Sequence, residues 1–523
     1  MAPKWYEWPM YAFATHRQFR RLAHTGTPLA SKNVSPETTI NDLEGGHDAS
    51  EKQQQQLEGR DPYLIDEQSS PEIDPKNWPT WKKVLTILQL SSLGLNLTFA
   101  SSVSATAGEG AAATYGVSQA VANLSGTAIF LIGFAWGALP LAPLSEELGR
   151  TPVYLWTLLM SSILEIGAGR SQHVYGQLLC RFFAGFTGAT PLSNSGGSVV
   201  DVSKPSERNF LFTLFSTSAF VGPVLGPVIG GLLTQYASWE WSYYLTAIWG
   251  FVVFLHVALF VEETYAPVLY REKAKALRRK TGDKRWHSKY DNPNLKEIFK
   301  VAMVRPFNFL LKEPIVIFFT IYISIVYFLL FGFLESYAVI FGEWYELDVV
   351  WIGVAFVPMI IGILAGGLFL IPFCLHYDRI IKKHGSMQPE EHLKPLLVGA
   401  VGLPISLFWL GWTCYPDRIP VYAPVSAGVL FGFSLFQIFV GTYQIIMSSY
   451  ARYAASALAG FTFVRYNISG GSVMASAPMF RNMTPHWAAT LLGIISALLI
   501  PVAFIFYKKG PAIRAKSSFA VND

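Results

Sequence analysis

One uncharged stretch of the chain reads Gly222-Pro223-Val224-Leu225-Gly226-Pro227-Val228-Ile229-Gly230-Gly231. It lies inside a longer apolar segment, 209–233, that contains no Asp, Glu, Lys or Arg. A helix of about 20 mostly apolar residues is long enough to cross the hydrocarbon core of a bilayer. Small residues let a neighbouring helix approach closely, and prolines are tolerated in membrane helices, which they bend. The stretch therefore predicts a bent membrane-spanning helix that packs tightly against another.

The rest of the chain repeats this pattern. Apolar residues make up 51% of the 523 positions and charged residues only 14%, well below the roughly 25% charged residues of a soluble domain. We predict twelve spans: Lys83–Ala105, Gln119–Leu141, Pro152–Ala168, Val174–Val200, Asn209–Leu233, Trp241–Val261, Pro314–Phe341, Val349–Phe373, Leu396–Trp412, Tyr422–Met447, Ser456–Ala477 and Trp487–Tyr507. A long charged insert divides them six and six, which predicts an all-α membrane protein of two six-helix bundles.

The polar segments define the remaining regions. Residues 1–82 are polar and low in complexity, with four consecutive glutamines at 53–56, and such a composition predicts a disordered tail. We expect an N-terminal bundle over 83–261, a basic linker over 262–313, a C-terminal bundle over 314–507 and a short tail over 508–523. No apolar stretch follows the first basic residues, so the start of the chain does not resemble a secretory signal.

The basic residues predict the orientation in the membrane. Thirteen Lys and Arg lie between Arg271 and Lys312, whereas the loops on the other side carry only Arg170, Arg418 and Arg481. Because cytosolic loops are enriched in Lys and Arg, we expect the linker and both termini in the cytosol. The net charge of +5 then reflects topology rather than nucleic-acid binding. We expect the plasma membrane, with a vacuolar or vesicular membrane as the alternative.

Cysteine and histidine give no sign of a metal, a disulfide framework or a membrane enzyme. The three cysteines, Cys180, Cys374 and Cys414, are far apart in or beside apolar segments, which is typical of buried thiols. The ten histidines are dispersed, and only His256 lies deep in a span. We therefore expect no cofactor and no enzymatic activity. The sequon Asn482-Met483-Thr484 falls in an outer loop and predicts a glycosylation site.

A charged turn joins the second and third spans. It reads Pro143-Leu144-Ser145-Glu146-Glu147-Leu148-Gly149-Arg150-Thr151-Pro152. An acid near a helix N-terminus is favoured by the helix dipole. We expect Arg150 to pair with a carboxylate on a neighbouring helix, and Asp201 at the inner end of span four is the candidate. Glu146, Gly149, Arg150 and Asp201 would then form a conformational latch.

This turn resembles the loop motif of the major facilitator superfamily, whose pattern is Gly, three residues, Asp, Arg, any residue, Gly and Arg. Here Glu146 replaces the Asp, Glu147 the first Arg, and Ala142 the first Gly. The Pro-Leu-Ser-Glu form is similar to the fungal drug:proton antiporter branch with twelve spans. Gly222, Pro223, Gly226, Pro227, Gly230 and Gly231 match the antiporter motif of that branch.

Further matches to the branch extend over residues 74–519. They comprise Asp74–Pro79, Arg181–Gly185, Gly196-Gly197, Asp201, Glu263–Leu269, Lys273-Ala274, Ala454–Ala459 and Arg465. Glu240 and Ser448 depart from the residues that the branch usually has. The resemblance implies two packed bundles with alternating access, a small-molecule substrate, protons as the coupling ion, a lipid bilayer as surroundings and a monomer.

Charged residues inside a membrane are costly unless they face a cavity or a partner. Glu335 in span seven is our candidate for a protonatable or substrate-binding group, with a structural pair or an outward-reaching acid as the alternative. Arg181 in span four is linked by the resemblance to proton transfer, and a structural ion pair or an anion-holding role is the alternative. We interpret Glu165 as a residue at the membrane edge. Candidates to line the cavity are Asn194, Gln437, Gln444, Tyr322, Tyr327, Phe331, Tyr337 and Phe436.

These features favour a secondary transporter driven by the proton gradient. A sparsely charged aromatic cavity suits amphiphilic drugs, toxins or secondary metabolites, so we expect an exporter. The alternatives are a nutrient, sugar, vitamin or polyamine transporter of the same fold, and a membrane sensor without transport. The direction of transport distinguishes an exporter from a nutrient importer. The absence of counterflow in vesicles would favour a membrane sensor without transport.

Overall fold

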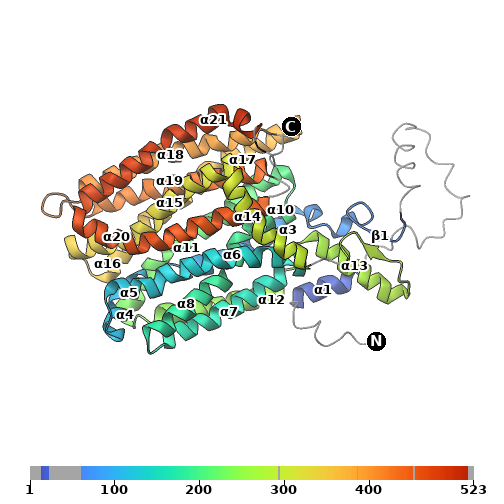
Figure 1. Cartoon of the computed structure of the whole chain (residues 1–523), viewed down its shortest axis with the longest axis horizontal. Helices are drawn as coiled ribbons and strands as arrows, with labels where there is room; N and C mark the ends of the chain where they lie inside the picture. Colours follow the sequence, from blue (N-terminus) through green and yellow to red (C-terminus); the bar gives the residue numbers. More distant parts are fainter. Residues whose placement is uncertain are drawn as a thin grey trace, which may run out of the picture.

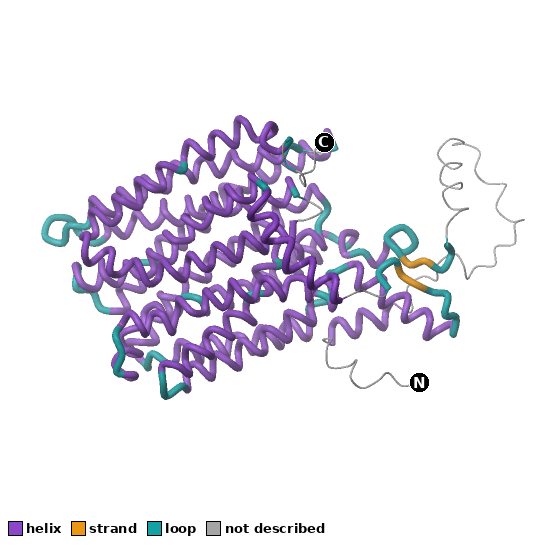
Figure 2. Tube along the Cα trace, viewed as in Figure 1, coloured by secondary structure: helices purple, strands orange, loops and turns teal. Residues whose placement is uncertain are grey.

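The computed structural model describes residues 13–22, 61–291, 295–385, 387–450, 454–515 and 517. Long helices run side by side along one axis (Figure 1). The described strands are two short ones that lie outside this bundle (Figure 2). We call the end of the bundle that carries the linker helix α13 (Ala266–Thr281) the linker end, and the opposite end, which carries Gly116, the far end.

The N-terminal half consists of helices that are joined by short turns. They are α3 (Thr80–Ala100), η5 (Val103–Thr106), α4 (Gly108–Tyr115), α5 (Gln119–Asn123), η6 (Leu124–Ala128), α6 (Ile129–Leu148), α7 (Arg150–Arg170), α8 (Val174–Gly188), α9 (Thr190–Ser193), α10 (Ser195–Val202), α11 (Pro205–Tyr236) and α12 (Trp241–Phe260). α11 packs against α3, and α6 packs against α8.

The C-terminal half has the same character. Its elements are α15 (Pro314–Tyr337), η7 (Ala338–Trp344), α16 (Val349–Val354), α17 (Val357–His384), η8 (Pro389–His392), α18 (Leu393–Thr413), α19 (Tyr422–Ser449), α20 (Ala454–Leu498) and α21 (Ile500–Arg514). The helix α14 (Leu295–Lys312) leads into it and packs against α20 and α6.

Ten described helices are long and apolar enough to span a membrane, and two local features account for the difference from the twelve predicted spans. Span four is divided into α8, α9 and α10, because Pro191 has no N–H to donate and Asn194 leaves the helical conformation at φ −99° and ψ 3°. Spans eleven and twelve are joined in one element, within which Thr484 has φ +62° directly before Pro485. The predicted all-α fold is confirmed.

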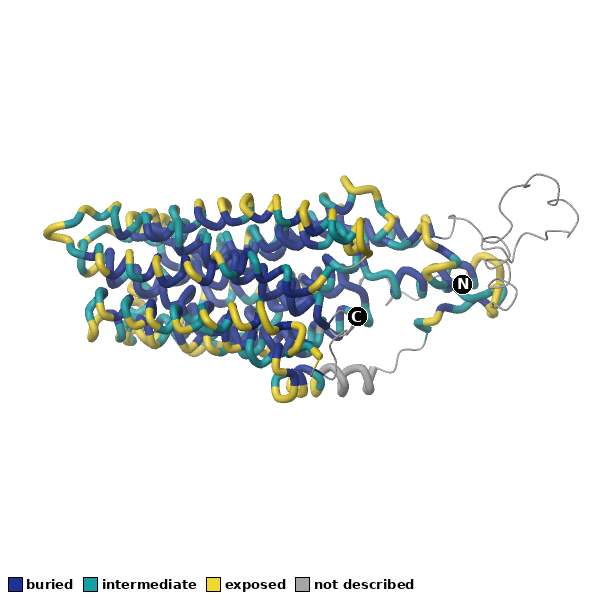
Figure 3. The backbone as a smooth tube through the Cα atoms, turned by 90° about the horizontal axis from the view of Figure 1, so that it is seen from above, coloured by how far each residue is buried: buried dark blue, intermediate teal, exposed yellow. Residues whose placement is uncertain are grey.

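The burial pattern is that of a protein surrounded by lipid. The interior of the bundle is buried, and exposed residues lie on its outer surface (Figure 3). Large apolar side chains on that surface are well exposed, with 50% for Trp136, 67% for Leu368 and 68% for Leu498. A continuous apolar exterior of this extent marks a membrane-facing surface.

The two halves meet along α11 and α6 on one side and α17, α16 and α20 on the other. At the far end, the guanidinium of Arg481 lies 2.5 Å from Glu343 and 3.2 Å from Gln119, which belongs to the other half. Toward the linker end, the ring of Phe212 on α11 stacks on Tyr443 of α19 with centroids 5.7 Å apart. The halves therefore touch on both sides of the centre.

Part of the N-terminal tail is ordered against the linker. The helix α1 (Phe13–Leu22) and the strand β1 (Leu64–Ile65) join a buried apolar cluster with α13. β1 pairs in parallel with β2 (His287–Ser288), and η3 (Pro71–Ile73) and η4 (Pro75–Asn77) lead from β1 to α3. The predicted disorder of residues 1–82 is therefore wrong for 13–22 and 61–82. The tail folds there because the linker supplies the apolar partner that it lacks alone; residues 1–12 and 23–60 lie outside the described residues.

Candidate transport site and conformational latch

The turn between α6 and α7 requires glycine. Gly149 has φ +103° and ψ 155°, a conformation that side chains with a Cβ rarely adopt. It directs Arg150 back across the turn, where Nε donates to Asp201 at 3.0 Å and Nη1 to the hydroxyl of Ser145 at 2.7 Å. Glu146 lies farther away, at 3.6 Å from the guanidinium. The expected pair of Arg150 and Asp201 is thus present, and its role as a latch stays a prediction.

A second carboxylate, Glu263, holds the same turn from the other side. It is fully buried just after α12 and accepts hydrogen bonds from the backbone N–H groups of Arg150 at 3.0 Å and Thr151 at 3.1 Å. It also accepts from Thr264 and Tyr265 at 3.0 and 2.9 Å. Helix N-termini leave such groups unpaired and favour negative charge. Glu263 therefore caps α7 and ties it to the end of α12.

The glycines of span five allow two close approaches. A Cβ added to Gly222, Gly226 or Gly230 would collide with the last turns of α3 and with η5, for example with the backbone N of Val103 at 2.8 Å from Gly226. A Cβ on Gly231 would lie 2.7 Å from the carbonyl oxygen of Val349 in the other half. The motif therefore permits tight packing within the N-terminal half and across the junction of the halves, as close small-residue helix contacts do.

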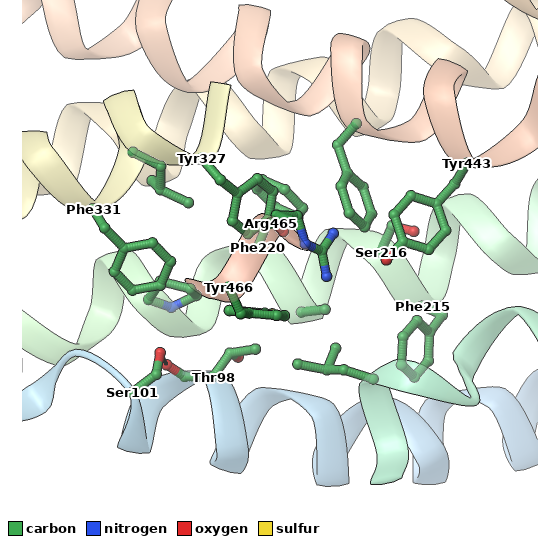
Figure 4. A pocket seen from close by; sticks show the side chains of 15 residues that line it. Thr98, Ser101, Phe215, Ser216, Phe220, Tyr327, Phe331, Tyr443, Arg465 and Tyr466 are labelled. Carbon is green, nitrogen blue, oxygen red and sulfur yellow. Dashed lines mark hydrogen bonds between the residues drawn. The ribbon is translucent and has the colours of Figure 1, made fainter. Parts of the chain in front are cut away.

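A small cavity lies between the halves near the middle of the bundle. Its lining residues come from both halves: Thr98, Ser101, Leu192, Phe215, Ser216, Ala219, Phe220, Pro223, Tyr327, Leu330, Phe331, Phe439, Tyr443, Arg465 and Tyr466 (Figure 4). The free space is about 20 Å³, room for one water molecule or two. The walls are mostly aromatic, and the hydroxyl groups of Thr98, Ser101 and Ser216 lie on the N-terminal side.

Arg465 of α20 supplies the charge of this cavity. It is 1% exposed, and Figure 4 shows its guanidinium among the aromatic rings. The rings of Tyr327 and Tyr466 have centroids 4.3 and 4.5 Å from the guanidinium carbon. Its Nε and Nη1 atoms have no hydrogen-bond partner among the described residues. A cation held mainly by ring faces is thus the polar centre of the cavity.

Residues 90–475 match the family model of the Major Facilitator Superfamily. The chain belongs to this superfamily. It is 39% identical to the MFS-type transporter kojT of Aspergillus flavus, with 85% of this chain and 80% of the relative covered. It is 36% identical to the ascochitine biosynthesis cluster MFS transporter of Didymella fabae, with 86% and 87% covered.

A third relative is the multidrug transporter TPO1_2 of Candida glabrata, 34% identical over 86% of this chain and 78% of the relative. Among solved structures, the partially occluded inward-open xylose transporter XylE of E. coli has a TM-score of 0.54 at 15% identity, covering 80% of this chain and 98% of that chain. The latter likeness concerns the fold alone. The superfamily that the motifs indicated is confirmed, and the relatives are fungal transporters, as the resemblance implied.

Only some of the predicted residues of this superfamily member line the cavity. Tyr327 and Phe331 do. The amide of Asn194 donates to Ser145 at 2.8 Å and so lies with the latch. Gln437 donates to the carbonyl oxygen of Gly366 at 2.9 Å, between α19 and α17. The ring of Tyr337 stacks on Phe356, with centroids 4.4 Å apart.

Arg181 lies in an ion pair within the N-terminal half. Its Nη1 donates to Glu165 at 2.6 Å, and its other nitrogens donate to the carbonyl oxygens of Gly126 at 2.7 Å and Ala100 at 2.9 Å. Both side chains are buried, at 0% and 1% exposed. The interpretation of Glu165 as a membrane-edge residue is therefore wrong, because the pair with Arg181 allows it to lie inside the bundle. This geometry favours the structural ion pair among the alternatives for Arg181.

Glu335 lies at the junction of the halves but outside the lining of the cavity. It is buried on α15, and its Oε2 accepts from the amide of Asn123 at 2.7 Å. Asn123 belongs to α5 in the N-terminal half. The other oxygen, Oε1, has no partner among the described residues. Glu335 stands eight residues beyond Tyr327, about 12 Å along a helix axis.

Two residues of this site were missed by sequence reasoning. The rule that singled out Glu335, a lone charge in an uncharged span, applies equally to Arg465, which was noted only as a motif match. Glu263 gave a weaker signal, an acid just after a span, and its partners lie more than 110 residues away in the chain. Asn482 is exposed at the far end, as a glycosylation site requires.

Proposed function

We propose that the protein is a proton-coupled exporter of amphiphilic small molecules that works by alternating access. The observation that carries this proposal is Glu335, a buried acid with one oxygen bonded across the two halves and the other unpartnered among the described residues. The aromatic cavity supports an amphiphilic substrate. The printed names of two relatives, a multidrug transporter and a metabolite-cluster transporter, agree with export of such compounds.

The acid links protonation to the movement of the halves. Burying a carboxylate charge beside one amide is costly, so the closed arrangement favours the form of Glu335 that carries a proton. When the halves separate at the far end, the bond from Asn123 breaks and water reaches the carboxyl group, which then holds its charge at low cost. A proton gradient across the membrane thereby biases the exchange between closed and open states.

We also propose an orientation. The linker end carries the thirteen basic residues between Arg271 and Lys312, so it faces the cytosol. Export then begins at the end where Phe212 stacks on Tyr443 and finishes at the end where Arg481 contacts Gln119. The plasma membrane is the location that suits this direction, and the chain acts as a monomer.

The test is efflux from cells that lack their own pumps, followed by transport in inside-out vesicles with and without an imposed pH gradient. We expect Glu335→Gln to remain in the membrane and to lose stimulation by the gradient, because the amide cannot exchange a proton. The matched control is Glu346→Gln, since Glu346 lies exposed beyond the same helix. Full gradient-driven transport by Glu335→Gln would remove Glu335 from the mechanism, and increased drug sensitivity on overproduction would indicate import.

A further inference from the structure

Arg465 differs from the other buried cations of the bundle. Arg150, Arg181 and Lys83 each lie within 3.0 Å of a carboxylate, at Asp201, Glu165 and Glu207 respectively. No ion pair to a carboxylate is found for Arg465 within the described part of the chain, and two of its nitrogens have no hydrogen-bond partner there. Among the described residues, the buried cation that faces the cavity is therefore the one for which no carboxylate partner is found.

Aromatic rings surround this guanidinium instead. Their centroids lie 4.3 to 5.6 Å from the guanidinium carbon, for Tyr327, Tyr466, Phe461, Tyr443 and Phe439. Ring faces attract a cation, but they accept none of the in-plane N–H bonds that a guanidinium offers. A carboxylate or other planar anion matches that fork of donors. The arrangement thus holds the charge in place and leaves two of its donors, Nε and Nη1, without a hydrogen-bond partner among the described residues.

Glu335 does not supply the missing partner. It stands about two turns farther along α15 than Tyr327, and its bonded oxygen is held by Asn123. The polar groups on the facing wall are the neutral hydroxyls of Thr98, Ser101 and Ser216. Among the residues that line the cavity, Arg465 therefore sets the sign of the charge that the cavity favours.

We propose that Arg465 binds the anionic group of the transported substrate, and that preferred substrates are planar aromatic weak acids, such as carboxylates and ionised phenols or enols. The rings that surround Arg465 would stack on the planar body of such a molecule, while the guanidinium takes the charge. This inference rests on the proposed function, because it names the chemical class of the cargo.

Two xanthene dyes of similar shape and opposite charge test it: fluorescein, an anion, and rhodamine 123, a cation. Binding to the purified full-length protein in lipid nanodiscs is measured by fluorescence polarisation. We expect fluorescein to bind at least about tenfold more tightly than rhodamine 123, because a hydrogen bond to a charged group is worth more than one tenfold step. Arg465→Gln should abolish this preference, and Arg465→Lys should retain part of it.

The control variant is Arg418→Gln, which removes an exposed cation from a far-end loop and should leave the preference unchanged. Arg465→Lys also guards against misfolding, since it keeps the charge. Equal binding of the two dyes by the wild type, or a preference that survives Arg465→Gln, would overturn the proposal. So would failure of both fluorescein and the smaller anion salicylate to bind.

Transport in vesicles separates this inference from the proposed function. Gradient-driven export of rhodamine 123 without export of fluorescein would overturn the anion site and leave the exporter intact. A fluorescein preference in binding that depends on Arg465, without gradient-driven movement of either dye, would support the anion site and refute proton-coupled export.

Discussion

Glu263 offers a direct measure of what holds the turn between α6 and α7 in place. Replacing it with alanine removes the acceptor of four backbone N–H groups, those of Arg150, Thr151, Thr264 and Tyr265. A buried donor without a partner costs about 1–3 kcal/mol, and loss of a charge at a helix N-terminus adds about 0.3–1 kcal/mol. Water that enters the vacated space will satisfy some of the donors. We therefore expect Glu263→Ala to lower the free energy of unfolding by about 2–4 kcal/mol.

The protein contains its own reporters for this assay. Cys374 and Cys414 are buried, so a thiol-reactive fluorogenic dye labels them only as the purified protein unfolds on heating. The control is Glu262→Ala, one residue earlier, where the carboxylate is partly exposed and pairs with Lys82 at 2.5 Å. Such a pair contributes about 0–1 kcal/mol. Equal melting temperatures for the two variants would refute the view that Glu263 caps α7.

The other predictions concern packing and the latch. Gly226→Leu should stop transport in vesicles, because even a Cβ at this position collides with η5 and overpacking costs about 1–3 kcal/mol or more. The control Gly471→Leu should transport normally in the same vesicle assay, since a Cβ at Gly471 would have no atom within 4 Å. Equal transport rates for the two variants would show that transport does not depend on the close packing at Gly226. Asp201→Asn should slow transport in vesicles, since it removes the acid 3.0 Å from Arg150, whereas Glu146→Gln, at 3.6 Å from the guanidinium and partly exposed, should have a small effect. The reverse order would assign the latch to Glu146.

The membrane architecture was predictable because each span must satisfy its backbone internally, and hydropathy records that requirement residue by residue. The break in span four was not predicted, although Pro191 is a signal for it. Apolar composition indicates that a segment lies in the membrane, but it does not indicate whether the helix is continuous. The two ion pairs Arg150–Asp201 and Arg181–Glu165 differ in how readily the sequence predicts them. The first joins two loop-proximal charges in a known motif, and the second depends on which face of each helix turns inward.

Cavity residues were the hardest to predict. Asn194 and Gln437 are polar residues in apolar spans, as cavity residues are, but each donates to a group on a neighbouring helix. A polar side chain in a membrane helix can either line a cavity or hydrogen-bond to a neighbouring helix, and the rotation of the helix about its axis decides which of the two occurs. Tyr327 and Phe331, four residues apart and so on one face of α15, both line the cavity. Arg465, for which no carboxylate partner is found among the described residues, shows that one charge in an uncharged span indicates the cavity better than a group of aromatic residues does.

The size of the central void has a bearing on energy conservation. This cavity, with about 20 Å³ of free space, has room for one water molecule or two. In the proposed proton-coupled cycle, a carrier that returned empty with a continuous file of water inside would dissipate the gradient, because protons move readily along such files. In that cycle, the closely packed rings of Phe220 and Phe439, with centroids 4.4 Å apart, would limit such leakage.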